Sequence, residues 1–269
     1  MKVLNGSEIA GFIKERQLHQ SRSLRQSAGV TPRLAIVRTN DSLVTETYLS
    51  LKKAYGEDIE VVVDVYTTTT DELFDLIKRL NNDKKVNGVI IQLPLADQAQ
   101  TDLALKLVAP EKDVDGLGGV SSFTPATAMA INWLLSGYNI ELSGKKIAIV
   151  GKGRLVGAPL SQMWQDSGYD VMVCDSQTTD LGAVLRQADV IVSAAGVPGL
   201  VTGDMVSQGV VVVDAGTASE NGKIVGDVAE DVRLRDDVII TPIKGGVGPL
   251  TVAALFDNVL TAARSSCHK

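Results

Sequence analysis

Short apolar segments alternate with amphipathic, helix-like segments along almost the whole chain, and this alternation restricts the possible folds more than any other feature. Each apolar segment is rich in valine and isoleucine and only a few residues long, as expected for a strand buried on both faces. Helix-like segments separate most neighbouring strands, which is the pattern of βαβ units and parallel sheets. We predict strands at residues 33–38, 59–66, 88–93, 146–151, 169–174, 189–195, 210–216 and 237–242.

Two glycine-rich segments interrupt this alternation and indicate how the chain is divided. The first, DGLGGVSSFTP, lies after the third predicted strand and leads into a helix with Thr124 as N-cap and Pro125 as its first residue. The second, KGGVGP at residues 244–249, precedes a final apolar helix. We therefore expect one α/β domain at residues 1–120, a second at residues 125–243 and a last helix at residues 249–265.

Composition removes several classes of function. The 269 residues carry a net charge of −6, which gives little support for a nucleic-acid or anionic-membrane partner. No apolar run approaches the roughly 18 residues that span a bilayer, and the N-terminus becomes charged too early for a signal peptide, so we expect a cytoplasmic protein. Cys174 and Cys267 provide neither a disulfide framework nor a metal site. The only histidines, His19 and His268, lie outside any motif, which argues against a serine–histidine or cysteine–histidine nucleophile.

The segment KIAIVGKGRLVGAPL, residues 146–160, has the form of a strand, a glycine-rich turn and a helix. Its glycines follow the spacing G-x-G-x-x-x-G, one residue longer than the usual dinucleotide-binding pattern. Gly151 would permit the tight turn, Gly153 would let a pyrophosphate approach the backbone, and the following helix would offer its free N–H groups. Asp175, after the next strand, would accept a hydrogen bond from the ribose of NAD. The alternative for the glycines is a turn that needs small residues only for packing. The alternative for Asp175 is a solvated aspartate in a turn.

A second set of polar residues lies in the first half of the chain. Tyr48 and Lys52 are four residues apart in a helix-like segment, so their side chains share one face. A tyrosine and a lysine at this spacing also occur in short-chain dehydrogenases, but there the pair follows the glycine-rich turn, so the order in this chain excludes that family. The alternative to a functional role for Lys52 is an ordinary solvated lysine on the helix surface. Gln92 follows a buried strand, and Asp113 and Asp115 lie on the next loop. We expect these groups to converge at one edge of the first sheet, where α/β proteins place functional residues.

At this point the chain resembles the bifunctional methylenetetrahydrofolate dehydrogenase/methenyltetrahydrofolate cyclohydrolase family. The matching segments occur in family order: TYLSLK (47–52), QLPL (92–95), KDVDG (112–116), VGKGRLVGAP (150–159), NGKIVGDV (221–228) and TPIKGGVGPLT (241–251). The resemblance implies an α/β fold with an N-terminal catalytic domain that binds folate and a C-terminal Rossmann-like domain that binds NADP, or alternatively NAD. It also implies that the last helix returns to the first domain, and that the protein is a homodimer.

The resemblance also implies roles for individual residues. Lys52 matches the catalytic lysine, Gln92 the glutamine that orients it, Asp115 the aspartate that holds the pterin ring, and Tyr48 the tyrosine that packs against the folate. The implied substrate-side residues of the GGVGP loop and its continuation are Gly246, Pro249 and Thr251. The implied cofactor-binding residues are Gly151, Lys152, Gly153, Ser176 and Thr217. The residues themselves add Asp175 and Arg154 to the predicted cofactor site, because Arg154 could offset the charge of Asp175 beside a 2′-phosphate. The family reaction oxidises 5,10-methylenetetrahydrofolate to the 5,10-methenyl compound and hydrolyses that compound to 10-formyltetrahydrofolate, without a metal.

The chain departs from the family pattern in three places. Only LGGVSS separates Gly116 from Phe123, where the family has a longer segment. Lys152-Gly153 replaces Arg-Ser, and Asp175 replaces a histidine. These departures leave open a monofunctional dehydrogenase and an inactive paralogue that binds folate and NAD(P). Two other classes also remain at this stage: a non-catalytic NAD(P)-binding regulatory module, and another two-domain dehydrogenase such as one acting on shikimate-like acids.

Overall fold

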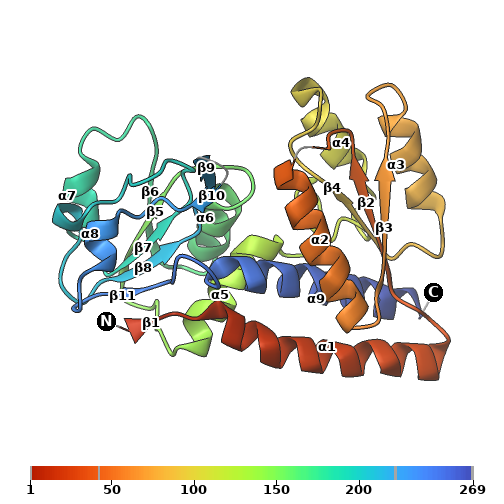
Figure 1. Cartoon of the computed structure of the whole chain (residues 1–269), viewed down its shortest axis with the longest axis horizontal. Coiled ribbons are helices and arrows are strands. Elements are labelled where there is room, and N and C mark those ends of the chain that lie inside the picture. The colour runs from red at the N-terminus through yellow and green to blue at the C-terminus, as the bar shows by residue number, and fades with distance from the viewer. Residues whose placement is uncertain (1, 42, 221–222, 268–269) are drawn as a thin grey trace. The chain divides into compact units, whose positions relative to one another are not determined.

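The computed structural model describes residues 2–41, 43–220 and 223–267. The chain divides into two compact units, each made of two separate stretches of sequence (Figure 1). The three-stranded unit comprises Gly11–Ala126 and Val252–Lys269, and the six-stranded unit comprises Met1–Ala10 and Thr127–Thr251. The predicted two-domain α/β fold is therefore confirmed.

The three-stranded unit contains a parallel sheet in the order β3-β2-β4. One face of this sheet packs on α3, whose buried residues Leu73, Leu76, Ile77 and Leu80 recur at the spacing of one helix face. On the other side of the core Tyr55 of α2 stacks on Phe256 of α9, with ring centroids 5.1 Å apart. The elements are β2 (Arg33–Arg38), β3 (Val62–Thr67), β4 (Gly88–Ile91), α2 (Leu43–Asp58), α3 (Leu73–Asn82), η1 (Gln98–Gln100) and α4 (Thr101–Leu107). The helices α1 (Gly6–Ala28) and α9 (Val247–Ser266) begin in the six-stranded unit and belong to this one from Gly11 and Val252 onward.

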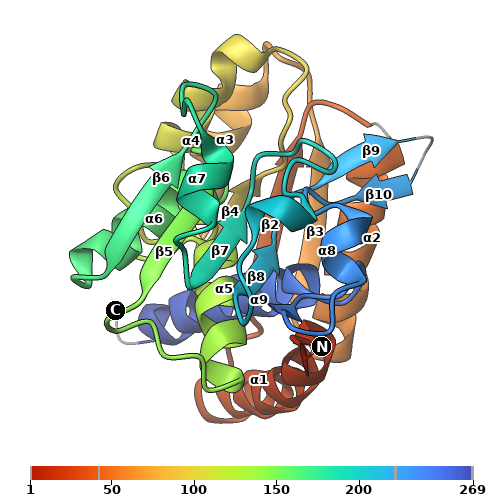
Figure 2. The same ribbon diagram turned by 90° about the vertical axis from the view of Figure 1, so that its left-hand side faces the viewer.

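The six-stranded unit contains a parallel sheet in the order β1-β11-β8-β7-β5-β6, and Figure 2 shows β6, β5, β7 and β8 side by side. The chain goes from β5 to β6 on one side and then crosses to β7 on the other, so the order reverses at β5. The strands are β1 (Lys2–Val3), β5 (Lys146–Val150), β6 (Asp170–Cys174), β7 (Val190–Ser193), β8 (Val211–Asp214) and β11 (Ile239–Ile240). The other elements are α5 (Ala126–Gly137), α6 (Gly157–Asp166), α7 (Leu181–Leu185), η2 (Gly203–Met205), α8 (Glu230–Arg233) and the antiparallel hairpin β9 (Ala218–Glu220) and β10 (Lys223–Val225).

The first ten residues require a correction. The sequence assigns residues 1–120 to one domain, whereas the structure places Met1–Ala10 in the six-stranded unit. Lys2 and Val3 pair in parallel with Ile239 and Ile240, and the backbone N–H of Asn5 donates to the Tyr138 hydroxyl at 2.9 Å. This edge strand has only two residues, too few to produce a pattern of apolar residues.

Strand boundaries also differ from the prediction. The segment 33–38 is reproduced, but the predicted strand 59–66 begins only at Val62. The chain leaves α2 through Glu60, which has a left-handed φ of 58°, while the N–H of Val61 bonds back to the Gly56 carbonyl. Ile59 and Val61 precede the strand and are buried where α2 ends, which explains why this part of the predicted strand is apolar. Within the described ranges, we find no helix of the length and apolarity needed to cross a membrane.

Candidate active site

Lys52 and Gln92 form the centre of the candidate site in the three-stranded unit. Lys52 lies on α2, and its Nζ donates a hydrogen bond to Oε1 of Gln92 at 2.9 Å. Gln92 directly follows β4, where its backbone N–H bonds to the Val37 carbonyl at 2.8 Å. Its Nε2 donates to the Leu93 carbonyl at 3.2 Å, so the amide oxygen faces the ammonium. Tyr48 lies one helical turn before Lys52 and is partly exposed.

Asp115 lies on a loop that a neighbouring carboxylate holds in shape. The Asp113 side chain is buried and accepts hydrogen bonds from the backbone N–H groups of Gly116 at 3.1 Å and Gly118 at 2.8 Å. Gly116 has a φ of 71°, and a Cβ there would lie 2.8 Å from the backbone nitrogen of Pro125. The loop between Asp113 and Gly118 therefore has little freedom, and Asp115 is fixed within it.

Asn258 of α9 is a residue of this site that the sequence analysis did not identify. Its Nδ2 donates to the carbonyls of Val114 and Thr124, both at 2.9 Å. The amide thus ties the two sides of the loop around Asp115 to the last helix. The only available signal was an asparagine at a position of α9 where the helix periodicity requires a buried residue.

The charges of the site influence one another. Loss of contact with water lowers the pKa of Lys52, and the nearby Asp115 carboxylate opposes that shift. Burial raises the pKa of Asp115, and the Lys52 ammonium opposes that shift in turn. The ammonium consequently gives up its proton more readily than an ordinary surface lysine. The surface-lysine alternative does not fit a side chain in these surroundings.

In the six-stranded unit, the predicted cofactor residues follow the carboxyl ends of neighbouring strands. Val150 of β5 is in register with Cys174 of β6 and with Ser193 of β7, so these strands end at the same level. Gly151, Lys152, Gly153 and Arg154 follow β5, Asp175 and Ser176 follow β6, and Thr217 lies shortly after β8. Ligands of open α/β sheets bind at this edge, next to the strand where the order reverses.

The glycine-rich turn fits the close approach of a phosphate group. Gly151 has a φ of 100°, and a Cβ on it would lie 2.5 Å from the Ala194 carbonyl oxygen. A Cβ on Gly157, the first residue of α6, would lie 1.9 Å from the Gly151 carbonyl oxygen. The third glycine therefore serves helix–strand packing, as predicted, and the one-residue insertion leaves the N-terminus of α6 close to the turn. The Ala158 N–H, however, donates to the Gly153 carbonyl at 3.0 Å and Pro159 has no N–H, so the start of α6 offers an anion fewer N–H groups than the sequence predicts.

Asp175 also has a structural role in its own turn. Its Oδ1 accepts a hydrogen bond from the Gln177 N–H at 2.9 Å, and its backbone N–H donates to the Thr178 hydroxyl at 3.0 Å. Asp175, Ser176 and Gln177 are exposed. The turn alternative is thus partly correct, since this carboxylate shapes the loop to which it belongs.

Gly246 directly precedes α9, and Pro249 and Thr251 lie near the start of that helix, all within the six-stranded unit. The Gly245 carbonyl accepts a hydrogen bond from the Ser7 N–H at 2.9 Å, and a Cβ on Gly6 would lie 1.9 Å from the Gly246 carbonyl oxygen. This loop is therefore packed closely on the N-terminal segment. Contact of these residues with the folate stays a prediction.

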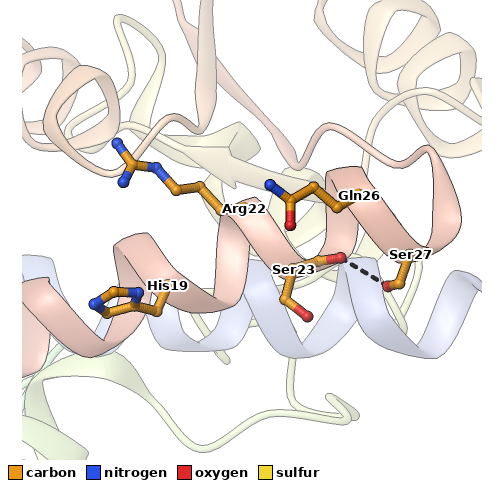
Figure 3. A pocket seen from close by; sticks show the side chains of 5 residues that line it. All are labelled: His19, Arg22, Ser23, Gln26 and Ser27. Atoms are coloured by element: carbon orange, nitrogen blue, oxygen red, sulfur yellow. Dashed lines mark hydrogen bonds between the residues drawn. The ribbon is translucent and has the colours of Figure 1, made fainter.

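A hollow on the surface of α1 is a poor alternative site. Five exposed side chains line it, namely His19, Arg22, Ser23, Gln26 and Ser27 (Figure 3). All five come from one helix. The one hydrogen bond drawn among them joins the Ser27 hydroxyl to the Ser23 carbonyl within that helix. The hollow offers neither an enclosed surface nor groups from different elements.

Comparison with known proteins assigns both parts of the chain. Residues 4–115 match the catalytic domain of tetrahydrofolate dehydrogenase/cyclohydrolase, and residues 125–267 match the NAD(P)-binding domain of the same family. The bifunctional protein FolD of Macrococcus caseolyticus is 37% identical, with 98% of each chain covered. The crystal structure of the bifunctional enzyme FolD from Campylobacter jejuni is 38% identical and superposes with a TM-score of 0.92, covering 98% of this chain and 99% of that chain.

A third relative was solved with ligands. The methylenetetrahydrofolate dehydrogenase-cyclohydrolase of Trypanosoma brucei, complexed with NADP cofactor and an inhibitor, is 30% identical with a TM-score of 0.91, covering 99% of this chain and 98% of that chain. These matches confirm the resemblance inferred from the motifs and extend it over nearly the whole chain. The chain belongs to the tetrahydrofolate dehydrogenase/cyclohydrolase family.

Proposed function

We propose that this protein oxidises 5,10-methylenetetrahydrofolate to 5,10-methenyltetrahydrofolate with NADP and then hydrolyses the methenyl compound to 10-formyltetrahydrofolate. The observation that carries this proposal is the Lys52–Gln92 hydrogen bond beside Asp115, because it provides a proton-transfer group where the family match places the catalytic domain. The glycine-rich turn at the carboxyl edge of the larger sheet supports the redox half of the reaction.

The residues divide the work between the two steps. Bound NADP supplies the nicotinamide that accepts a hydride from the one-carbon bridge. The protein's part in that step is to hold the two reactants in line, since no protein group carries the hydride. The turn Gly151–Gly153, beside the start of α6, would hold the pyrophosphate, and Asp115 would bind the pterin ring. Tyr48 packs against the folate, and the loop that contains Gly246, Pro249 and Thr251 lines the folate-binding site.

Hydrolysis of the methenyl cation requires proton transfers, and Lys52 is placed to make them. Water attacks the cationic carbon, and ring opening then needs a proton delivered to the departing nitrogen. Burial already lowers the pKa of Lys52, and the positive charge of the substrate lowers it further. The amine can then take a proton from the attacking water and return it to the nitrogen.

An absorbance assay with 5,10-methylenetetrahydrofolate and either NADP or NAD tests the proposal. We expect reduced cofactor and methenyltetrahydrofolate to form, and the methenyl absorbance to decay as 10-formyltetrahydrofolate appears. Methenyl accumulation without enzymatic decay would instead indicate the monofunctional dehydrogenase, and no signal with either cofactor would indicate the inactive paralogue. No feature of the site favours either alternative, since Lys52, Gln92 and Asp115 are all in place.

Replacement of Gln92 by alanine should give a moderate loss of hydrolysis. The variant keeps the Lys52 ammonium but removes its 2.9 Å hydrogen bond, so the amine is present without being oriented. We expect hydrolysis of 5,10-methenyltetrahydrofolate to fall by about 10-fold, near the cost of one charge-assisted hydrogen bond. Initial rates with the methenyl compound as substrate measure this effect. A Gln92→Ala variant with the parent rate would contradict the orienting role.

Asp175 should influence which cofactor is preferred. We propose NADP as the preferred cofactor, with Lys152, Arg154 and Ser176 near its 2′-phosphate, although the Asp175 carboxylate repels that phosphate. Two unit charges 4 Å apart in water repel by about 1 kcal/mol, so Asp175→Ser should raise the ratio of kcat/KM for NADP over NAD about fivefold. Asp170→Ser is the control, because Asp170 lies at the opposite end of β6. An unchanged or lower ratio in Asp175→Ser would show that the carboxylate does not face the 2′-position.

The homodimer, the cytoplasmic location and the absence of nucleic-acid and membrane partners stay predictions. Analytical ultracentrifugation tests the first of these directly.

A further inference from the structure

Asp227 is a fully buried carboxylate that receives four hydrogen bonds from a single short segment of chain. The Ser193 hydroxyl donates to it at 2.8 Å. The backbone N–H groups of Ala195, Gly196 and Val197 donate at 2.7, 3.3 and 2.9 Å. These donors lie at the end of β7 and immediately after it. Asp227 therefore determines the path of the chain where it leaves β7.

That segment lies against the glycine-rich turn of the cofactor site. The Ala194 N–H bonds to the Val150 carbonyl at 2.7 Å, and the Ala194 carbonyl oxygen is the atom that a Cβ on Gly151 would meet. Residues 194–197 and Gly151 thus form adjoining parts of the carboxyl edge at β5, the strand where the order reverses.

A second carboxylate holds Asp227 in place. Asp214 of β8 accepts hydrogen bonds from the N–H groups of Asp227 at 3.0 Å and Val228 at 3.2 Å. The Arg233 guanidinium forms an ion pair with Asp214 at 2.5 Å. A Cβ on Gly216 would lie 2.1 Å from the Asp227 carboxylate, so the loop that leads to Thr217 is also shaped by this group.

The strand order indicates which part of the cofactor these loops face. In doubly wound sheets the adenosine ribose lies by the residue after the second strand, here Asp175 after β6, and the pyrophosphate lies at the strand where the order reverses. The cofactor must then continue across that strand toward β7 and β8. Residues 194–197 and Thr217 follow those two strands, so they lie on the nicotinamide side.

We propose that Asp227 is a positioning residue for hydride transfer, which fixes the loop after β7 so that the nicotinamide is held in its reactive orientation. This inference rests on the proposed function. Asp227 touches neither substrate nor cofactor and acts through the backbone of residues 195–197. Substitution by asparagine tests it closely, because an amide NH₂ would face N–H donors and at least one backbone group would lose its acceptor.

The experiment compares Asp227→Asn with the parent protein. We expect the dehydrogenase kcat to fall at least about 10-fold with NADP and with NAD alike, because small misplacements in a reactive complex are costly. The KM for each cofactor should change less than about threefold, because the adenosine and pyrophosphate contacts remain. Hydrolysis of added 5,10-methenyltetrahydrofolate without cofactor should keep its rate, because Lys52 lies in the other unit.

A spectroscopic measurement separates this role from a general loss of structure. NADPH should bind Asp227→Asn with a dissociation constant close to the parent value, while the fluorescence anisotropy of its bound nicotinamide ring falls. Asp231→Asn is the matched control, since the exposed Asp231 side chain also accepts a backbone hydrogen bond, from Gly203 at 2.9 Å, in the same unit. We expect this control to keep the parent kcat and anisotropy.

Two results would overturn the proposal. One is an unchanged dehydrogenase kcat in folded Asp227→Asn, and the other is a kcat loss with unchanged anisotropy. If Asp227→Asn does not fold, Ser193→Ala decides, because it removes one donor and leaves the carboxylate in place. A decrease of both kcat and anisotropy in Ser193→Ala then supports the proposal, and parent values overturn it. A parent protein without dehydrogenase activity would instead contradict the proposed function, before any variant is measured.

Discussion

Lys52→Met is expected to hydrolyse 5,10-methenyltetrahydrofolate at least about 100-fold more slowly than the parent protein, because proton transfer by a positioned side chain contributes about 10²–10⁴-fold. Methionine keeps the apolar stem and a similar helix propensity, so α2 should persist. Hydride transfer involves no protein proton carrier and should be reduced less. In the coupled assay, methenyltetrahydrofolate should therefore accumulate, and its absorbance gives the measurement.

Lys53→Met provides the control for this variant. Lys53 is the next residue on the same helix and is exposed, so the variant loses the same charge without touching Gln92. It should hydrolyse the methenyl compound at the parent rate. If Lys52→Met also does so, Lys52 has no catalytic role and the proposed hydrolysis mechanism fails.

Gly151→Ala is expected to lose dehydrogenase activity and to keep the hydrolysis of methenyltetrahydrofolate, the reverse of Lys52→Met. The new Cβ would lie 2.5 Å from the Ala194 carbonyl oxygen in a residue with a φ of 100°, so the turn must move. A displacement of about 1 Å can cost about 100-fold in rate, and we expect a loss of at least that size in dehydrogenase kcat/KM. Hydrolysis of added methenyltetrahydrofolate should continue, because its proton-transfer groups belong to the other unit.

Gly168→Ala distinguishes displacement of the cofactor turn from the backbone strain of placing alanine at a positive φ. Gly168 also has a positive φ, of 80°, but a Cβ there would meet nothing within 4 Å. It lies in the turn between α6 and β6, so Gly168→Ala introduces backbone strain without displacing the cofactor turn. The control should lose some stability and keep its dehydrogenase activity. Equal losses in both variants would attribute the Gly151 effect to destabilisation alone.

The sequence predicts those parts of the fold that depend on long apolar patterns. β2 lies where the apolar segment 33–38 predicts it, because all four inner residues of that strand are buried. β1 could not be predicted, since its two residues are exposed and their strand conformation comes from pairing with Ile239 and Ile240. The hairpin of β9 and β10 was missed as well, because three-residue strands are too short to show an alternation.

The candidate site shows the same limit at the level of side chains. The convergence of Lys52 and Gln92 was predictable, because a residue after a parallel strand and a residue on an adjacent helix meet at the carboxyl edge. The hydrogen bond between them depended on the rotamers of both side chains and required coordinates. Asp227 and Asn258 act by satisfying backbone groups of distant loops, and no local pattern in the sequence reveals which loops those are.

The interleaving of the two units has a consequence for any attempt to dissect the protein. Cleavage after Ala126 would leave the three-stranded sheet without Phe256 and Asn258, which reach it from the end of the chain. The complementary piece would lack β1, which pairs with β11. Neither half is an independently folding domain that could be expressed or fused on its own. A ribosome must release nearly the whole chain before either unit can complete its core.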